Sequence, residues 1–532
     1  MSSANNHNEY DYVIIGSGFG GSVSALRLSQ KGYKVLVVEK GAWFKDSNYA
    51  KNAWNLRKWL WMPRIGLRGI MKMTVLPHIT VYSGVGVGGG SLTYGATLPT
   101  PKSSFFQSGS WSSLQNWEEV LKPFYAEALR MLGAVTNPTL TEADHIIEEL
   151  ALRLGKDKEF HPSRVGVFFS DRNQQGNFVP DPYFDGDGPD RKGCIQCGGC
   201  MTGCRHNAKN TLDKNYLYLA QKLGAEIIAE REVTDVLPAG HADGRDGYFV
   251  SFKSSRPLQK GEPEVVSTKG VIFSGGVLGT VPLLLGLKAS GSLRHLSDQV
   301  GADIRTNNET VTNVTSFRDN VDFAQGVTIG SVLHTDENSH LEPINHNARS
   351  GFMRFLSAPN VHGKHVFARA LSFLGLMMKE PGKHLKVLFT RHWGKRTIML
   401  LFMQHLDSTL RLERRPGGKL RTSAGDGQKP SRDIPESQAI TREIEGLIDG
   451  KATTGITEAL FGTPSTAHIL GGAVMGESTN AGVINDKCQV YGYRNMLVCD
   501  GSAISANPGV NPSLSITAVT EWAMSHIPAN KA

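Results

Sequence analysis

The first forty residues alternate apolar runs with a glycine-rich turn in a pattern that predicts a parallel βαβ unit. Tyr12 to Ile15 form a short apolar run, and Ser22 to Gln30 carry small and apolar residues on one face of a helix. A second strand is predicted at Lys34 to Val38 and ends at Glu39. Strand, turn, helix and strand within about thirty residues is the size of one βαβ unit.

The same pattern returns later in the chain. An apolar strand at Gly270 to Ser274 precedes a helix at Val277 to Leu285, and a strand at Met496 to Val498 precedes a helix at Pro512 to Met524. Residues 301 to about 455 instead show alternating strands. Cores split beyond roughly 250–300 residues, so this chain of 532 residues is expected to form two domains. Further helices are predicted near Glu118–Leu132, Thr141–Leu154 and Asn215–Leu223, and strands within Glu226–Val236 and at Thr409–Glu413.

The turn after the first strand has the spacing of a dinucleotide-binding site. Gly16, Gly18 and Gly21 fit G-x-G-x-x-G, with Gly20 also inside the turn. The glycines allow a tight turn, a close approach of pyrophosphate and close packing of helix on strand, while the helix N-terminus faces the phosphate. Glu39, 18 residues after Gly21, stands where a carboxylate accepts hydrogen bonds from ribose hydroxyls. A carboxylate argues against a 2′-phosphate, but the turn alone does not separate FAD from NAD.

The formal net charge is +8, and a basic protein can bind nucleic acid or an anionic membrane surface. We expect no nucleic-acid ligand, because no long lysine tract or RNA-binding signature is present. Lys51–Met73 and Phe373–Arg396 place basic residues beside apolar and aromatic ones, which is typical of peripheral contact with a membrane surface and also of core helices with a solvated basic face. With no apolar run of 18 residues and no signal-peptide pattern, we expect a cytoplasmic protein, peripheral at the membrane.

Four of the six cysteines lie within eleven residues. Cys194, Cys197, Cys200 and Cys204 have ferredoxin-like spacing, although Arg205 replaces the usual proline. We predict a metal centre here, with an iron–sulfur cluster favoured over zinc. The alternative is a set of buried thiols that shape a tight loop. A zinc ribbon that binds nucleic acid is a third interpretation, but it leaves the glycine turn unexplained.

The C-terminal motifs resemble those of the glucose-methanol-choline (GMC) flavin oxidoreductases, in the branch that contains the cholesterol oxidases. His468-Ile-Leu-Gly-Gly precedes Val498-Cys-Asp-Gly-Ser and then Gly509-Val-Asn-Pro-Ser-Leu-Ser-Ile-Thr-Ala, in the family's order and spacing. The segment Gly86–Leu92 resembles the loop that lies along the flavin. The resemblance extends from about residue 10 to 525.

The resemblance implies particular roles for residues. It places His468 and Asn511 at the reactive end of the flavin, where an imidazole can accept the hydroxyl proton and an amide can hydrogen-bond the substrate oxygen. Either residue could instead be structural, His468 in a glycine turn and Asn511 as a helix N-cap before Pro512. The cofactor-binding set that it implies is Gly16, Gly18, Gly20, Gly21, Glu39, Gly89, Gly90, Ser91, Val233, Asp500, Gly501, Asn511 and Pro512.

Two positions depart from the family pattern. Thr93 stands about where some members attach FAD to histidine, so we expect non-covalent FAD. Tyr94 stands where cholesterol oxidases usually have asparagine, so contacts with the flavin are expected to differ there. No motif identifies the family glutamate that moves a steroid double bond, and Glu309 and Glu342 are the candidates.

The resemblance also implies a fold and a reaction. We expect an α/β protein in which a Rossmann-like FAD-binding domain (residues 8–105, 194–300 and 456–532) is interleaved with an α+β substrate-binding domain built on an antiparallel sheet (residues 106–193 and 301–455). The expected activity is FAD-dependent oxidation of a hydrophobic alcohol, the 3β-hydroxyl of a sterol, by hydride transfer to flavin. The alternative is a long-chain aliphatic alcohol dehydrogenase that passes electrons through an iron–sulfur cluster.

Overall fold

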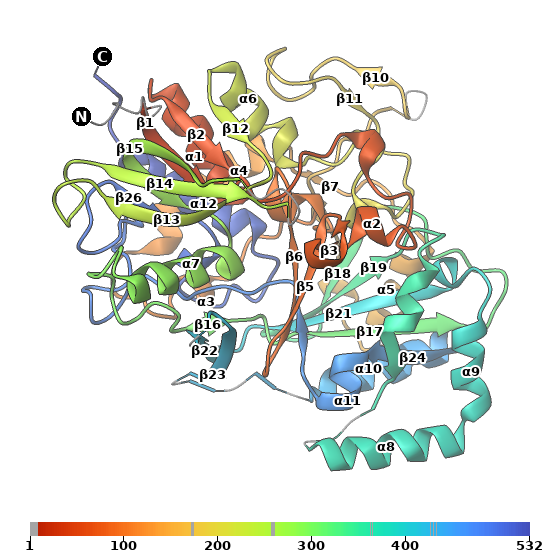
Figure 1. The fold of residues 1–532 in the computed structure, drawn as a ribbon. Coiled ribbons are helices and arrows are strands. Elements are labelled where there is room, and N and C mark those ends of the chain that lie inside the picture. The colour runs from red at the N-terminus through yellow and green to blue at the C-terminus, as the bar shows by residue number, and fades with distance from the viewer. Residues whose placement is uncertain are drawn as a thin grey trace.

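The chain folds around two seven-stranded sheets that lie at opposite ends of the molecule (Figure 1). The computed structural model describes residues 9–171, 175–256, 261–361, 363, 365–415, 417–425, 427–428, 430–431 and 433–531. Residues 8 and 532, the outer limits of the predicted FAD-binding domain, lie outside the described residues.

The first sheet contains the predicted βαβ unit. Strands β12, β2, β1 and β15 pair in parallel, β26 continues the parallel pairing on β15, and β14 and β13 extend the sheet in antiparallel pairing. Their bounds are β1 Glu9–Ile15, β2 Val35–Val38, β12 Glu226–Ile228, β13 Arg231–Pro238, β14 Tyr248–Ser254, β15 Glu264–Phe273 and β26 Met496–Val498. Since β2 is buried throughout, its continuous apolar run suits a parallel strand covered on both faces.

Helices from distant parts of the sequence pack around this sheet in one core. Helix α1 packs against α6 and α12, and α12 packs against α4. The predicted helices are confirmed, with shifted ends: α1 begins before Ser22, and α12 begins one residue after Pro512. The bounds are α1 Phe19–Gln30, α4 Trp117–Met131, α6 Tyr216–Lys222, α7 Val277–Ser290 and α12 Ser513–Ser525.

The second sheet is antiparallel throughout and lies lower in Figure 1 and to the right. Its strands run in the order β20, β24, β17, β21, β19, β18 and β8. Their bounds are β8 Phe160–Pro162, β17 Thr310–Ser316, β18 Ser331–His334, β19 Ser339–Asn345, β20 Ser357–Pro359, β21 Thr397–Gln404 and β24 Gly450–Gly455. This sheet confirms the predicted α+β part of the fold. The exact domain limits stay a prediction.

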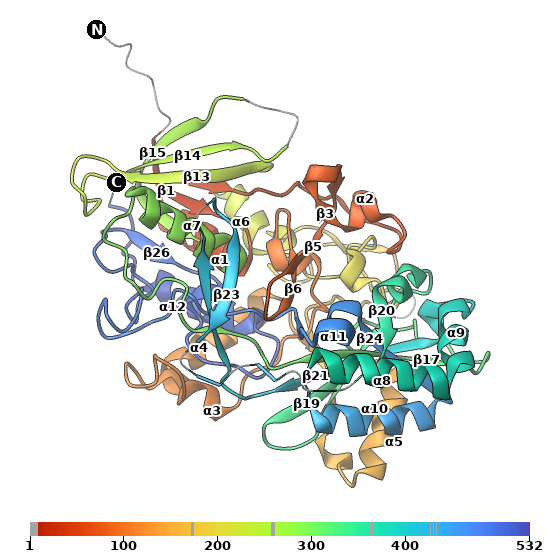
Figure 2. The same cartoon turned by 60° about the horizontal axis from the view of Figure 1, so that its bottom comes forward.

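The two faces of the second sheet are covered differently. Ile398, Leu400 and Phe402 of β21 pack into one apolar cluster with helices α5 (Glu142–Arg153) and α10 (Pro435–Leu447). Because side chains alternate along a strand, Met399, Leu401 and Met403 point to the other face, in a separate apolar cluster. Figure 2 shows α5 and α10 together on one side of this sheet. The face with the methionines is therefore free of these helices and can line a site.

The remaining elements connect or cover the two sheets. Strands β5 (Met71–Val75), β6 (Thr80–Gly84) and β25 (Ser465–Thr466) form a small sheet of their own. Helices α8 (Val366–Lys379) and α9 (Pro381–Phe389) lie at the edge of the molecule in Figures 1 and 2, and α8 packs against α11 (Ile456–Phe461). The other short elements are α2 Leu56–Trp59, α3 Ser103–Phe106, β3 Trp61–Met62, β4 Leu67–Arg68, β7 Val135–Thr136, β9 Arg164–Val165, β10 Phe178–Val179, β11 Arg191–Lys192, β16 Ile304–Arg305, β22 Thr409–Arg414 and β23 Leu420–Ala424.

Membrane-spanning segments were sought among the described residues, and none of their helices combines the length and apolar character that crossing a bilayer requires.

Candidate active site

The first glycine turn is packed so closely that side chains are excluded at several positions. Gly16 has φ +101°, and a Cβ there would lie 2.4 Å from the carbonyl oxygen of Ser274. A Cβ on Gly20 would lie 1.5 Å from the carbonyl oxygen of Cys499, and one on Gly21 would lie 2.0 Å from that of Gly16. These glycines bring α1 against β1 and the ends of β15 and β26, which is the packing that the dinucleotide motif predicts.

The N-terminus of α1, which follows this turn, is suited to bind an anion. Gly18 is the N-cap residue, and it supplies no side-chain cap. The first turn of α1 carries no acidic side chain. A Cβ on Gly18 would find its nearest neighbour only at 3.9 Å, so the space beside Gly18 is open. The N–H groups of this first turn can therefore serve a phosphate.

Glu39 lies at the end of β2 and faces the same turn. Its carboxylate accepts hydrogen bonds from the backbone N–H of Ser17 (3.1 Å), the hydroxyl of Ser17 (2.8 Å) and the N–H of Gly41 (2.7 Å). The carbonyl of Glu39 accepts the N–H of Arg231, which brings Val233, two residues on in β13, to the same edge. Glu39 is thus a direct neighbour of the turn, and Val233 lies on the strand that begins beside Glu39.

The second glycine-rich loop lies directly on the first. A Cβ on Gly89 would be 2.6 Å from Cα of Gly18. Gly90 is less crowded, with Phe19 as its nearest neighbour at 3.7 Å. Ser91 is buried; its hydroxyl donates to the carbonyl of Gly88 and accepts the N–H of Leu212. Gly90 therefore borders open space, whereas Gly89 and Ser91 hold the loop in place.

Asp500 joins the C-terminal motif to the rest of the site. Its carboxylate accepts hydrogen bonds from the N–H of Gly276 (2.8 Å), the hydroxyl of Thr280 (2.5 Å) and the N–H of Ser502 (2.7 Å). Burial raises the pKa of Asp500, and these hydrogen bonds oppose the rise. The carbonyl of the adjacent Gly501 accepts the N–H of Gly471. Through Asp500 and Gly501, the segments around residues 276, 471 and 500 meet at one place.

His468 lies beside this junction and is paired with a carboxylate. Its Nδ1 is 3.0 Å from Oε2 of Glu309, and both side chains are buried. Burial lowers the pKa of His468, but the charge and hydrogen bond of Glu309 outweigh burial and leave that pKa above its ordinary value. The hydroxyl of Thr466 donates to Glu309 and accepts the N–H of His468. These contacts fix the imidazole and leave Nε2 for another partner.

Asn511 lies on the other side of His468. Its Nδ2 is 3.5 Å from Nε2 of His468 and donates to Oε2 of Glu342 at 3.2 Å. Pro512, not Asn511, is the N-cap residue of α12, so the structural alternative for Asn511 is wrong. The Oδ1 atom of Asn511 is buried and has no hydrogen-bond partner among the described residues. A buried amide oxygen without a protein partner is compatible with a site that receives a bound group.

Glu342 belongs to the antiparallel sheet. It lies opposite Leu401 in the β19–β21 pairing, and its side chain is on the face with the methionines. Burial raises its pKa to about 7, so this carboxyl holds a proton up to near neutrality. His340, on the same face, has its Nε2 3.8 Å from Glu342, and burial lowers the pKa of His340 to about 3. Sequence analysis named Glu309 and Glu342 only as candidates and did not predict their contacts with His468 and Asn511.

An apolar lining continues from these polar groups along the same face. Ile344 and Met399 lie one step further along their strands, in a cluster with Leu401, and Met201 packs against it. A small cavity of about 40 Å³ follows, bordered by Met201 and Met399 and by the residues Trp59, Met71, His346 and Met353. The site therefore has one polar end and an extended, methionine-rich apolar end. Methionine side chains adapt to irregular ligands.

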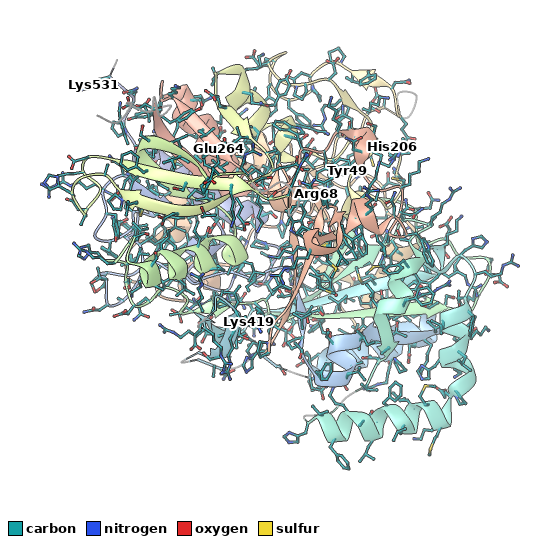
Figure 3. The ribbon with its side chains drawn as sticks, viewed as in Figure 1. Tyr49, Arg68, His206, Glu264, Lys419 and Lys531 are labelled. Carbon is teal, nitrogen blue, oxygen red and sulfur yellow. The ribbon has the colours of Figure 1, made fainter. Side chains whose placement is uncertain are left out.

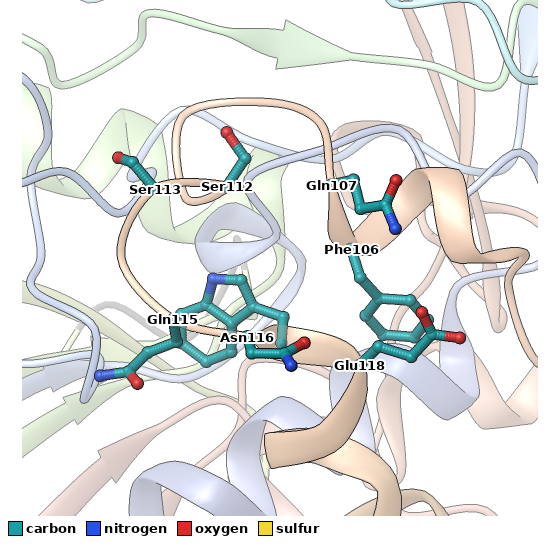
Figure 4. A pocket seen from close by; sticks show the side chains of 8 residues that line it. Phe106, Gln107, Ser112, Ser113, Gln115, Asn116 and Glu118 are labelled. Atoms are coloured by element: carbon teal, nitrogen blue, oxygen red, sulfur yellow. The ribbon is translucent and has the colours of Figure 1, made fainter.

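A larger hollow of about 350 Å³ lies elsewhere, around the loop that precedes α4 (Figure 4). Phe106, Gln107 and Glu118 border it, with Ser112, Gln115 and Asn116 on the loop. None of the predicted site residues lines it, so it is not the candidate active site.

The geometry of the four clustered cysteines gives no support to the expected metal centre. Among the described residues, no group of three or more His, Cys, Asp or Glu side chains is arranged to hold a metal ion. Cys194 and Cys204 pack against a small apolar cluster, and burial raises the pKa of Cys197 to about 11. Gly203 packs against the ring of the buried Tyr49, which is labelled in Figure 3. This arrangement agrees with the alternative of thiols that shape a tight loop, and the metal centre stays a prediction.

The fold and the site define a dinucleotide-binding α/β oxidoreductase with a buried histidine–carboxylate pair. Residues 186–307 and 425–520 match the N- and C-terminal family models of the GMC oxidoreductases, and residues 14–45 match a Rossmann-like NAD(P)-binding domain. A cholesterol oxidase of Acinetobacter baumannii is 42% identical over 98% of this chain and 95% of its own length. A cholesterol oxidase of Mycobacterium tuberculosis (strain ATCC 25618 / H37Rv) is 41% identical over 97% and 91%.

More distant matches agree in fold. A long-chain-alcohol oxidase of Arabidopsis thaliana is 25% identical over 95% of this chain and 65% of its own length. The crystal structure of pyridoxine 4-oxidase from Mesorbium loti superposes with a TM-score of 0.61 at 14% identity, and the match covers 97% of this chain and 99% of that one. The chain belongs to the GMC oxidoreductase family. It is an FAD-dependent oxidoreductase that acts on alcohols, and the residues around Gly18, Gly90 and Asn511 fit that cofactor.

Proposed function

We propose that the protein oxidises the 3β-hydroxyl group of a sterol. The observation that carries this proposal is the polarity of the site, since His468, Asn511 and Glu342 gather at one end and apolar side chains follow along one sheet face. A sterol has the same division, with one hydroxyl at the end of a long, rigid apolar body. Two relatives at 41–42% identity are named cholesterol oxidases.

The protein groups have separate tasks in this reaction. Bound FAD supplies the electron sink, which takes a hydride from the carbinol carbon. Glu309 holds Nδ1 of His468, so Nε2 is the atom that accepts the hydroxyl proton. Asn511, next to Nε2, orients the substrate oxygen with its amide. Loss of the proton and the hydride leaves the ketone as product.

The FAD site follows from the same contacts. Gly16, Gly18, Gly20 and Gly21 with the N-terminus of α1 would hold the pyrophosphate, and Glu39 the ribose. Gly89 and Gly90 with Ser91 would lie along the flavin, Val233 beside the adenine, and Asp500, Gly501, Asn511 and Pro512 at the reactive end. Thr93 in place of histidine supports non-covalent attachment.

The small cavity is too small to hold a sterol without movement of the side chains around it. A space of about 40 Å³ admits little more than one water molecule, so a sterol must displace side chains around it. Met201, Met353 and Met399 are suited to that displacement because thioether chains repack with little strain. A linear long-chain alcohol would need less room, which makes it the competing substrate.

Product analysis tests the substrate class. Purified enzyme is incubated with cholesterol or with hexadecanol in the same detergent, and the ketone or aldehyde is quantified together with hydrogen peroxide. The proposal expects cholestenone to form at a kcat/KM at least about tenfold above that for hexadecanol oxidation. Preference for hexadecanol would contradict it. Product without peroxide would point to an acceptor other than oxygen; an iron–sulfur path for those electrons has no support in the cysteine geometry.

A further inference from the structure

Helix α8 is attached to the molecule by a buried arginine. Arg369 donates hydrogen bonds to the carbonyl oxygens of Val361 (3.1 Å), Glu458 (2.7 Å) and Ala459 (3.1 Å). The last two belong to α11, which lies next to α8 in Figure 1. The guanidinium thus fixes which face of α8 points toward the molecule.

The face that remains outside is apolar. Phe367 and Met378 are 75% and 80% exposed, and Leu371 and Leu374 between them are each more than half exposed. Their spacing of four, three and four residues forms a continuous stripe along the helix. A surface helix of a globular protein normally turns such a stripe toward the core. Here the stripe faces away from the body, and exposed apolar stripes of this kind mark interaction sites.

The neighbouring helices extend the apolar surface. Helix α9, in contact with α8, exposes Leu385 and Phe389. Helix α11 exposes Ile456, Leu460 and Phe461. Since α11 ends seven residues before His468, this surface is connected in sequence to the candidate active site.

Basic residues accompany this surface. Lys379, Lys383, Lys386 and Arg391 are exposed, whereas Glu380 is the one acidic residue from 379 to 391. An apolar helix face flanked by lysines is the composition of segments that lie in the headgroup region of a bilayer. A second copy of the chain is a poorer partner, because a symmetric contact through this face would bring two basic clusters together.

We propose that the outward stripe of α8, with the exposed apolar residues of α9, docks onto an anionic lipid membrane. The apolar side chains enter the headgroup boundary, and the lysines contact lipid phosphates. The proposal rests on this surface alone and not on the identity of the alcohol. The surface overlaps the predicted stretch Phe373–Arg396. In the other stretch, Lys51–Met73, Trp59 and Trp61 are buried, whereas Trp54, Met62 and Ile65 are exposed.

Vesicle co-sedimentation of the FAD-loaded enzyme tests the proposal. The vesicles contain phosphatidylcholine alone or with about one third phosphatidylglycerol. Wild type should bind the anionic vesicles, and the double variant Phe367→Ser/Met378→Ser should bind them at least about tenfold more weakly. Phe178→Ser is the matched control, because Phe178 is 67% exposed in β10, outside this surface, and this variant should bind like wild type. The flavin spectrum and turnover of detergent-dispersed substrate confirm that each variant is folded.

Two results would overturn the proposal. One is wild type that stays in the supernatant with both vesicle types. The other is equal binding by wild type and Phe367→Ser/Met378→Ser. Sedimentation velocity tests the alternative that a second copy of the chain covers this surface. If the wild type is a dimer and the double variant is a monomer, the surface is a contact between two chains and the proposal is wrong.

Discussion

Nδ1 of His468 lies 3.0 Å from Oε2 of Glu309, although 159 residues separate the two in sequence. His468 follows the small sheet that joins the two halves, and Glu309 immediately precedes β17 of the antiparallel sheet. The pair therefore couples the part of the chain that binds FAD to the part that lines the apolar end. A buried carboxylate at this distance selects the tautomer that leaves Nε2 free to accept a proton.

The pairing predicts the pH dependence of Glu309→Gln. In wild type, Glu309 raises the pKa of His468, so His468 loses its ability to accept a proton as pH falls through that value. Without the carboxylate, burial lowers the pKa, and the acidic limb of kcat/KM should move to lower pH while the maximum falls about 100-fold. Glu309→Asp, which keeps the charge, should retain the position of the limb. An acidic limb that does not move in Glu309→Gln would exclude this role.

Glu342→Gln should raise the thermal stability of the protein near neutral pH, whereas deletion of a salt bridge would lower it. The folded pKa of about 7 lies above the ordinary 4.5, so the contribution of Glu342 to the stability of the wild type is greatest in acid and falls as pH rises through this window, by up to about 3 kcal/mol. Glutamine does not titrate, so the variant should gain thermal stability relative to wild type between about pH 5 and pH 8. Thermal unfolding at both pH values measures this, and parallel curves for the two proteins would refute it.

Two alanine substitutions in the glycine turn separate cofactor binding from packing. Gly18→Ala meets no atom within 3.9 Å and occurs at a φ of −71°, so the apoprotein should unfold at the wild-type temperature while FAD affinity falls at least about tenfold. Gly20→Ala would place its Cβ 1.5 Å from the carbonyl of Cys499 and should unfold the protein. Wild-type FAD affinity in Gly18→Ala, measured by fluorescence titration, would argue against pyrophosphate at this position.

Met399→Trp should lower kcat/KM for a large alcohol such as cholesterol more than for a small one such as cyclohexanol. Met399 borders the small cavity and lies on the sheet face that carries Glu342. The indole would fill the apolar end, so kcat/KM for cholesterol should fall at least about tenfold, with a much smaller loss for cyclohexanol. Met399→Leu, similar in volume, should resemble wild type. Equal losses for both alcohols in Met399→Trp would place the substrate elsewhere.

The sequence predicted best what depends on neighbouring residues. The run from Tyr12 to Glu39 folds as expected because its apolar spacing and glycines act locally. His468 and Asn511 were identified through the resemblance of the C-terminal motifs to those of the GMC family. Glu309 and Glu342 gave no such signal, because their contact with His468 and Asn511 depends on strand pairing between distant segments.

The cysteine prediction stays without support for a different physical reason. Spacing such as Cys194-x2-Cys197 establishes that thiols are close in sequence, but a metal also needs sulfur atoms directed at one point. In α8, the stripe from Phe367 to Met378 has ordinary amphipathic spacing, which alone would predict an inward face. Only the buried Arg369 reveals the reversed orientation.

Anaerobic reduction of the bound flavin by cholesterol tests the central claim most directly. Mixing the FAD-loaded enzyme with excess cholesterol should bleach the flavin absorbance at a rate that saturates with substrate. His468→Ala should keep its flavin and bleach at least about 100-fold more slowly. Equal bleaching of His468→Ala and wild type, or a wild-type flavin that cholesterol leaves oxidised while hexadecanol reduces it, would contradict the account.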